Sequence, residues 1–280
     1  KRRDHTYREL LTLLQLSPQH RKDLLSRGLT ETEVANMEAL GYKSTCAEES
    51  VAIARKLLKR GCRLEGVPGF FMNYHGDWEI AFYQKNNGYL CPVWSDEGLL
   101  IAFQIRLDVP YQKRKYVWLS SAKMEKGCSP GSPVSFSGVL NSPVIYVTEG
   151  VLKAEAAYQR TGHPYLGNPG VSAYKELELA LNRLKAHGVK VVIEANDMDK
   201  CIRLHCDRAY SEACADCEGS SHECPKKREK RDHIRKGCLK LYEICEKLGL
   251  ICKRAVWDTD DEGYWEENYK GIDDWELREL

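Results

Sequence analysis

Acidic residues follow two short apolar runs of the sequence, at the points where buried strands would end. Glu149 follows the run 144–148, and the pair Asp197 and Asp199 follows the run 191–195. Short runs rich in β-branched residues are typical of strands inside a parallel sheet. Because open α/β sheets place their sites at the carboxyl ends of such strands, we expect the three carboxylates to converge in one crevice.

Converging carboxylates repel each other unless a cation lies between them. Their hard oxygen ligands suit Mg²⁺ or Mn²⁺. A single acidic residue after a strand is more often a helix cap or a solvent-exposed group. The metal hypothesis therefore depends on all three residues together.

The length and charge of the chain limit what it can be. At 280 residues it can form one large domain or two modest ones, and 42 basic residues nearly balance 41 acidic ones. This balance argues against a protein that coats polyanions in general, but it leaves room for a local basic groove. No apolar run approaches a membrane span and no signal peptide is visible, so we expect a cytoplasmic protein without a membrane partner. The first residue is Lys and not Met, so the sequence leaves open whether upstream domains are missing.

Residues 1–62 are predicted to be helical. Ser17 and Pro18 form an N-cap and N1 pair, and residues 30–33 have the pattern of a capping box. Residues 63–140 are predicted to be mostly β, with a hairpin around the turn 95–98. We expect the helical segment to serve in packing or docking.

The predicted β region contains a local basic patch. Its cations are Arg106, Lys113, Arg114 and Lys115, and its interleaved aromatic residues are Tyr111, Tyr116 and Trp118. Cations and aromatic rings together suit a phosphate backbone and stacked bases. A solvated hairpin edge protected by Lys and Arg would have the same composition, so both interpretations stay open.

Residues 141–280 begin with a β-α-β-α-β series. Gly150 lets the backbone turn sharply after Glu149 and allows close approach of a phosphate or a metal, and Gly167 and Gly170 can do the same beside it. Asp273 and Asp274 supply a further carboxylate pair near the end.

Cysteine is concentrated in the last third of the chain, which holds eight of the twelve residues of this type. Cys214 and Cys217 form a knuckle that can grip one side of a zinc ion, and Cys224 with Cys206 or His222 can complete the site. We therefore predict a zinc-binding insertion at about 201–237. A charged loop with reduced thiols is the alternative.

The order of these features resembles the catalytic core of bacterial-type primases with a Toprim domain. It resembles most closely the primase-like proteins of bacterial mobile elements. The resemblance implies an α/β fold: a Toprim-type, Rossmann-like parallel sheet preceded by a helical segment and a small antiparallel β subdomain. The matching segments are Glu149-Gly150 for the first Toprim motif, 166–172 for the glycine turn, 197–199 for the second motif and 271–274 for the closing acidic element.

The resemblance also implies a function, which is primase-like nucleotidyl transfer on single-stranded DNA with nucleoside triphosphates. Glu149, Asp197 and Asp199 would hold Mg²⁺ or Mn²⁺, and Asp273 or Asp274 would serve a second metal. The residues that would orient phosphates are Lys153, Arg106 and Lys115. A replicative helicase is among the partners that the resemblance suggests.

The sequence departs from the primase pattern at one catalytic position. Lys153 stands where primases usually carry an acidic residue, so a metal contact is lost and a phosphate-binding lysine is gained. Two alternatives therefore stay open. One is a Toprim metal-dependent DNA nuclease, and the other is a non-catalytic nucleic-acid-binding replication module.

Overall fold

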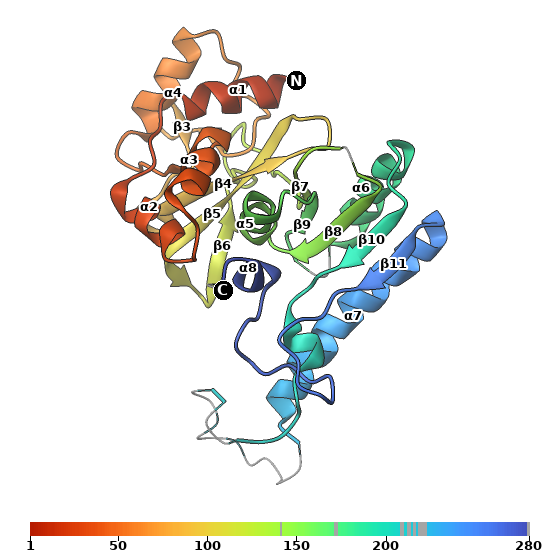
Figure 1. Cartoon of the computed structure of the whole chain (residues 1–280). Helices are drawn as coiled ribbons and strands as arrows, with labels where there is room; N and C mark the ends of the chain where they lie inside the picture. Colours follow the sequence, from red (N-terminus) through yellow and green to blue (C-terminus); the bar gives the residue numbers. More distant parts are fainter. Residues whose placement is uncertain are drawn as a thin grey trace.

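The computed structural model describes residues 1–140, 142–170, 173–207, 210–211, 214, 217 and 223–278. Within these ranges the strands form a four-stranded sheet, a five-stranded sheet and a two-stranded sheet. Figure 1 shows helix α5 (Val151–Thr161) between the two larger sheets. The predicted α/β class, with a parallel sheet preceded by helices and a small antiparallel sheet, is confirmed.

Four helices open the chain: α1 Arg2–Leu11, α2 Pro18–Leu25, α3 Glu31–Leu40 and α4 Ser50–Lys59. The predicted helix starts are confirmed. The Ser17 side chain accepts a hydrogen bond from the backbone N–H of His20, and Thr30 and Glu33 form the reciprocal bonds of a capping box. These caps satisfy amide groups that the first turn of a helix leaves without partners.

The antiparallel sheet has the strand order β1-β4-β5-β6. Its strands are β1 Lys43–Ser44, β4 Gly88–Trp94, β5 Leu100–Tyr111 and β6 Arg114–Trp118, and a separate pair is formed by β2 Phe70–Met72 and β3 Trp78–Ile80. A short 3₁₀ helix, η1 Gln84–Asn86, precedes β4. Strands β4 and β5 form the hairpin predicted around the turn 95–98.

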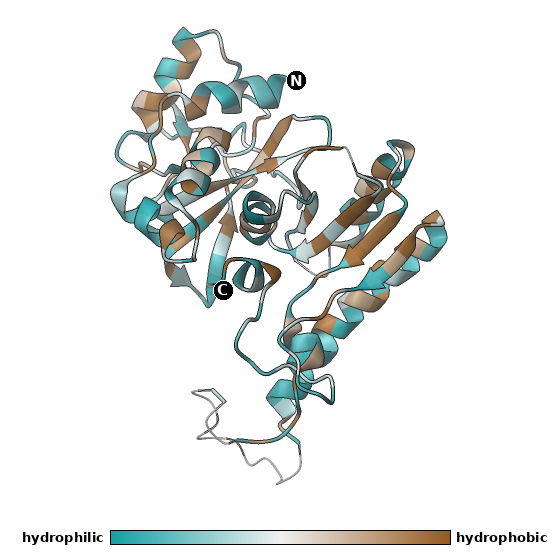
Figure 2. Cartoon of the chain, viewed as in Figure 1, coloured by the Kyte–Doolittle hydropathy of each residue, from teal (hydrophilic) through white to brown (hydrophobic). Residues whose placement is uncertain are grey.

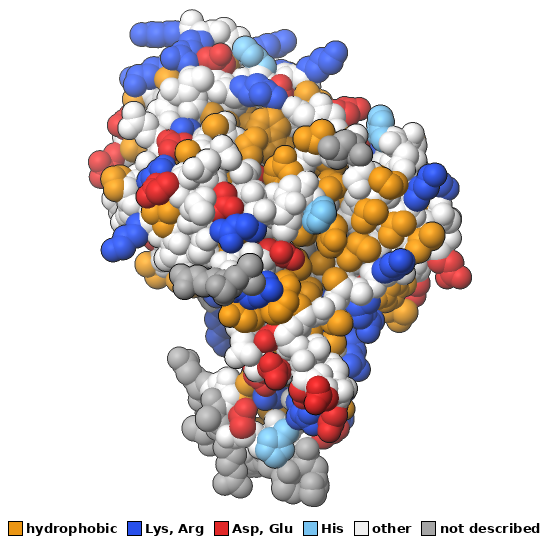
Figure 3. All heavy atoms as spheres, in the orientation of Figure 1, with side chains coloured by type: hydrophobic (Ala, Val, Ile, Leu, Met, Phe, Trp, Pro, Cys, Tyr) orange, Lys and Arg blue, Asp and Glu red, His pale blue; other side chains and the backbone are white. Residues whose placement is uncertain are grey.

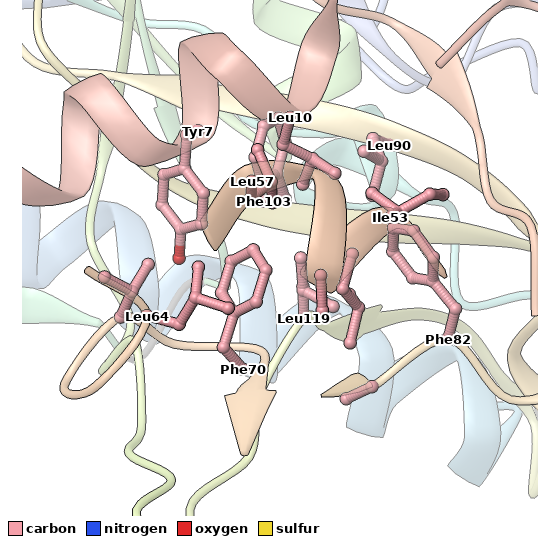
Figure 4. Close-up of a cluster of buried hydrophobic side chains, with 14 of the residues drawn as sticks. Tyr7, Leu10, Ile53, Leu57, Leu64, Phe70, Phe82, Leu90, Phe103 and Leu119 are labelled. Carbon is pink, nitrogen blue, oxygen red and sulfur yellow. The ribbon is translucent and has the colours of Figure 1, made fainter. Parts of the chain in front are cut away.

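Helices α1 and α4 pack on this sheet through one hydrophobic core. Tyr7, Leu10, Ile53, Leu57 and Phe103 are all 1% exposed or less. Figure 4 shows these side chains pointing toward one another from the helices and the strand. Burying side chains of this size stabilises the fold by roughly 1.5–3 kcal/mol each.

The second sheet has the order β11-β10-β8-β9-β7. Strands β8 Val144–Glu149, β9 Tyr165–Asn168, β10 Val191–Glu194 and β11 Ile251–Arg254 are parallel, and β7 Ser135–Ser137 is antiparallel at the edge. Helices α6 Tyr174–Ala186 and α7 Pro225–Leu248 cover one face through a second core. The 3₁₀ helix η2 Met198–Cys201 follows β10, and the short helix α8 Ile272–Glu276 lies near the end.

The other face of this sheet shows apolar side chains at the surface. Val144, Tyr146, Val191 and Ile193 are half-buried. Figures 2 and 3 show the hydrophobic strands β8 and β10 and the apolar side chains gathered over them.

Helix α7 corrects one expectation. The sequence pattern predicts a helix over 238–248, whereas the helix begins at Pro225. Proline suits the first helical position, and the charged residues after it are good helix formers despite their lack of an apolar stripe. No helix in the described ranges is long and apolar enough to cross a membrane.

Helix α5 joins the two halves of the fold. Its residues Val151, Leu152 and Ala156 share a buried cluster with Tyr89 and Ala102 of the antiparallel sheet. The carboxyl ends of β8 and β10 are thereby held against β5 and β6.

Candidate functional site

A cleft of about 790 Å³ lies between the two sheets, at the carboxyl ends of β8 and β10. It brings together residues from both halves of the chain. Its charged lining consists of Glu149, Asp197, Asp199, Glu229, Asp273, Asp274, Arg27, Arg106, Lys115, Lys153, Lys230 and Lys270. The predicted convergence of the acidic trio is therefore present, and it comes with a matching set of cations.

The parallel pairing of β8 with β10 explains why the acidic residues meet. The two strands run side by side in register, so their carboxyl ends reach the same edge of the sheet. Glu149 is the last residue of β8, and Asp197 and Asp199 belong to the turn that leaves β10. Gly150 has φ of 99°, a conformation that favours glycine, and it turns the chain directly into α5.

Two lysines pair with the aspartates. Lys153, in the first turn of α5, donates a hydrogen bond from its Nζ to Asp197 Oδ1. The Nζ of Lys270 lies 2.6 Å from Asp199 Oδ2 and 3.4 Å from Asp197 Oδ2. Both aspartate side chains are only 6% exposed, but the Lys270 side chain is 45% exposed against 26% for Lys153, so water screens the Lys270 pairs more than the Lys153 pair.

Burial and charge shift the pKa values in the cleft. Burial raises the pKa of Glu149, and the nearby Asp197 carboxylate adds to the effect. Burial by itself would lower the pKa of Lys153, but Asp197 and Asp273 more than offset this and raise it. Burial also raises the pKa of Asp273 to about 6. The cleft therefore holds carboxylates that favour a neighbouring positive charge.

Asp273 and Asp274, near the end of the chain, have different roles. The carboxylate of Asp274 accepts a hydrogen bond from the backbone N–H of Gly271 at 3.0 Å and so caps α8. Asp273 is 3% exposed, and its Oδ1 has no hydrogen-bond partner among the described residues. Asp273 belongs to the lining of the cleft, so a buried carboxylate oxygen without a hydrogen-bond partner lies in the cleft wall.

The described residues contain no group of three His, Cys, Asp or Glu side chains that could hold a metal ion as they stand. The ammonium groups of Lys153 and Lys270 lie against the aspartates instead.

A buried ion pair supports the turn that carries Asp197 and Asp199. Lys200 Nζ lies 2.9 Å from Glu194 Oε1, and the two side chains are 1% and 0% exposed. The same carboxylate oxygen accepts a hydrogen bond from the backbone N–H of Asn196 at 2.8 Å. The pair thus ties the end of β10 to η2 and fixes where the aspartates leave the sheet.

The opposite wall of the cleft is basic. Arg106 on β5 and Lys115 on β6 line it, and the Arg106 guanidinium lies 5.3 Å from the centre of the Tyr116 ring. Lys113 lies in the turn between these strands and Arg114 is the first residue of β6, and neither is part of the lining. The predicted basic patch is thus divided between the cleft wall and the hairpin end.

Comparison with solved structures shows which known proteins have a similar fold. The chain is similar to the Aquifex aeolicus primase (zinc-binding and RNA polymerase domains), with a TM-score of 0.61 and 12% identity over 98% of this chain and 57% of that chain. It is also similar to the RNA polymerase domain of Mycobacterium tuberculosis primase DnaG in complex with double-stranded DNA carrying a 6-nucleotide overhang. That match has a TM-score of 0.53 and 14% identity over 89% of this chain and 82% of that chain.

The fold is that of a bacterial primase catalytic core. The chain spans little more than half of the Aquifex primase chain, 57% of its length. No family model matches the sequence, and no curated protein matches it. Sequence identities this low establish the primase-like fold alone.

The glycine turn of this primase-like fold allows a close approach. A Cβ atom at Gly167 would come within 2.9 Å of the Gly150 carbonyl oxygen, so a side chain there would push β9 away from the start of α5. Gly170 has open space around it, and its neighbour Pro169 lines the cleft. Val171 and Ser172 lie outside the described residues.

The zinc hypothesis concerns residues of which only part is described. His222 lies outside the described residues. Cys224 is buried, and Cys206, Cys214 and Cys217 are half-buried with free thiols. The zinc site stays a prediction.

Sequence reasoning missed several residues of the cleft, namely Arg27, His233 and Lys270. It also passed over Glu194 and Lys200. A glutamate inside the apolar run 191–195 was a usable signal, because a charged residue in a buried strand requires a partner. Lys270 and Arg27 offer no such signal, since each reaches the cleft from a loop.

Proposed function

We propose that the cleft carries out primase-like nucleotidyl transfer on single-stranded DNA. In this reaction a 3′-hydroxyl oxygen forms a bond to the α-phosphorus of a nucleoside triphosphate, the bond to the β-phosphate oxygen breaks, and pyrophosphate leaves. The observation that supports this proposal is a single cleft whose lining combines four carboxylates with a basic wall. The carboxylates are those of Glu149, Asp197, Asp199 and Asp273. The primase-like fold is consistent with this reaction but does not by itself establish it.

The donor set suits a divalent cation. The carboxylates are hard oxygen ligands, and the buried Oδ1 of Asp273 has no partner among the described residues. Mg²⁺ or Mn²⁺ would be held by Glu149, Asp197, Asp199 and Asp273. Lys270, which lies against Asp197 and Asp199, would have to move aside. Such an ion neutralises triphosphate charge and lowers the pKa of an attacking hydroxyl group.

The chain itself would bind and orient the reactants. Arg106 and Lys115 would contact phosphate groups of the template or the incoming nucleotide from the antiparallel sheet. Tyr116, which also lines the cleft, would offer a ring face to a base. Lys153 would hold a phosphate from the opposite side, as a point charge without the two-pronged geometry of arginine.

Primer synthesis tests the proposal. The purified chain is incubated with circular single-stranded DNA, Mn²⁺ or Mg²⁺ and labelled ribonucleotides, and the products are resolved on a denaturing gel. We expect short labelled oligonucleotides from the unmodified chain and none from Asp197→Ala. Lys175→Ala, which removes an exposed lysine of α6, is the matched control. Equal labelling by the unmodified chain and Asp197→Ala would refute the proposal.

The ion pairs favour a second candidate, a non-catalytic module that binds nucleic acid. Lys153 and Lys270 pair with the aspartates and so compete with any cation for the same carboxylate oxygens. Retention of single-stranded DNA without synthesis would support this candidate, and nicking of plasmid DNA without nucleotides would indicate a nuclease instead. The mobile-element origin, the helicase partner and the cytoplasmic location stay predictions.

A further inference from the structure

A second cavity, of about 410 Å³, borders a different side of helix α5 from the cleft. Lys153 and Glu155 are two residues apart on this helix, so their side chains leave it about 200° apart. Lys153 lines the cleft, whereas Glu155 lines the cavity. Strand β7 supplies another wall and packs against both α5 and β4 (Figure 1). The volume of the cavity is within the range of small-molecule sites.

The walls of this cavity combine aromatic rings with carboxyl groups. The rings are those of Trp94, Phe136 and Tyr158. The lining that the structure describes also contains Asp96 and Glu155, and it contains no Lys, Arg or His side chain. The face of an aromatic ring carries partial negative charge and attracts cations. Rings and carboxyl groups together therefore favour a positively charged ligand.

The two carboxyl groups differ in how their charge is balanced. Arg183 donates hydrogen bonds to both carboxylate oxygens of Asp96 and so neutralises it. Glu155 is 4% exposed, and it accepts hydrogen bonds from two neutral groups, Gln159 Nε2 at 2.7 Å and the Ser137 hydroxyl. Burial raises the pKa of Glu155, and no cation among the described residues offsets this. Because a buried carboxylate is costly without a charged partner, the unmatched group in the cavity is Glu155.

We propose that this cavity binds an organic cation, a primary amine whose ammonium group pairs with the Glu155 carboxylate and whose apolar body packs against the aromatic rings. The ammonium group supplies the counter-charge that Glu155 lacks, through a hydrogen bond stronger than one between neutral groups. The Arg8 guanidinium lies 4.9 Å from the centre of the Trp94 ring, so this ring already attracts one cation. The cavity is separate from the cleft, and this site goes beyond the proposed function.

Ligand binding followed by nuclear magnetic resonance tests this proposal. The full chain is titrated at about pH 8 with phenethylamine, which is charged at that pH, and with phenethyl alcohol, which has the same ring and a neutral end. We expect the amine to bind at least about tenfold more tightly than the alcohol. Glu155→Gln keeps the shape of the side chain and should reduce the affinity for the amine to that for the alcohol. Glu246→Gln, which changes an exposed glutamate of α7, should behave like the unmodified chain.

Several results would overturn the proposal. One is equal affinity of the unmodified chain for the amine and the alcohol, and another is binding of neither. A preference for the amine that persists in Glu155→Gln would also overturn it, because the amine would then bind elsewhere, as at the acidic cleft. Circular dichroism checks that each variant is folded. If Glu155→Gln does not fold, Tyr158→Leu takes its place: it removes an aromatic wall and should weaken amine binding about threefold, and unchanged affinity would count against the site.

Discussion

Removing one partner of the buried ion pair between Glu194 and Lys200 should strongly lower the free energy of unfolding. Replacing Lys200 with methionine keeps most of the volume and leaves a carboxylate with 0% exposure without its ammonium partner. Breaking a buried pair in this way costs about 3–5 kcal/mol. The Nε of Arg254 lies 3.4 Å from the other oxygen of Glu194, so we expect the lower end, about 3 kcal/mol. For a chain of this size, that loss lowers the melting temperature by roughly 10 °C.

Urea denaturation followed by tryptophan fluorescence measures this cost. The double variant Glu194→Gln/Lys200→Met should be more stable than Lys200→Met alone, because it leaves no uncompensated charge and keeps an acceptor for the Asn196 amide. Lys240→Met removes one partner of an exposed pair in which both side chains are about half exposed, and it should leave the midpoint almost unchanged. A loss below about 1 kcal/mol in Lys200→Met, or a double variant no more stable than the single one, would show that the pair does not hold the turn.

Three further predictions concern other parts of the chain. Gly271→Ala should destabilise the protein by about 1–3 kcal/mol in urea denaturation, because the new Cβ would lie 2.3 Å from Asp273 Oδ1. The same change should weaken Mn²⁺ binding. An unchanged denaturation midpoint would contradict this close approach. Burial raises the pKa of Glu155 and so favours its neutral form in the folded protein. The stability that this form contributes is complete at pH values below the ordinary glutamate pKa of about 4. It is lost as the pH rises through the raised pKa. Glu155→Gln should remove that loss in unfolding free energies measured across the pH range, and parallel pH profiles would count against it. The cysteines around Cys214 and Cys217 should bind zinc near one equivalent by metal analysis of the purified protein, and its absence would leave a loop of reduced thiols.

The sequence by itself determined the elements that carry the acidic trio. The β-branched runs before Glu149 and Asp197 predict buried strands because side-chain alternation and propensity are local properties. The β4–β5 hairpin and the capping box at Thr30 followed from turn and cap chemistry over a few residues. The meeting of Glu149 with Asp197 also followed, since neighbouring parallel strands end at one edge of the sheet.

Only the tertiary structure decided how that site is charged. Lys270 and Arg27 enter the cleft from loops far from the aspartates in the sequence, and no local pattern encodes such an approach. The start of α7 at Pro225 was missed because its first turns are polar and show no apolar period. The aspartates, predicted as metal ligands, also pair with Lys153 and Lys270, because folding places flexible cationic side chains within reach of buried carboxylates. The sequence thus fixes which groups line the sheet edge, whereas the packing of distant segments sets which charges face them.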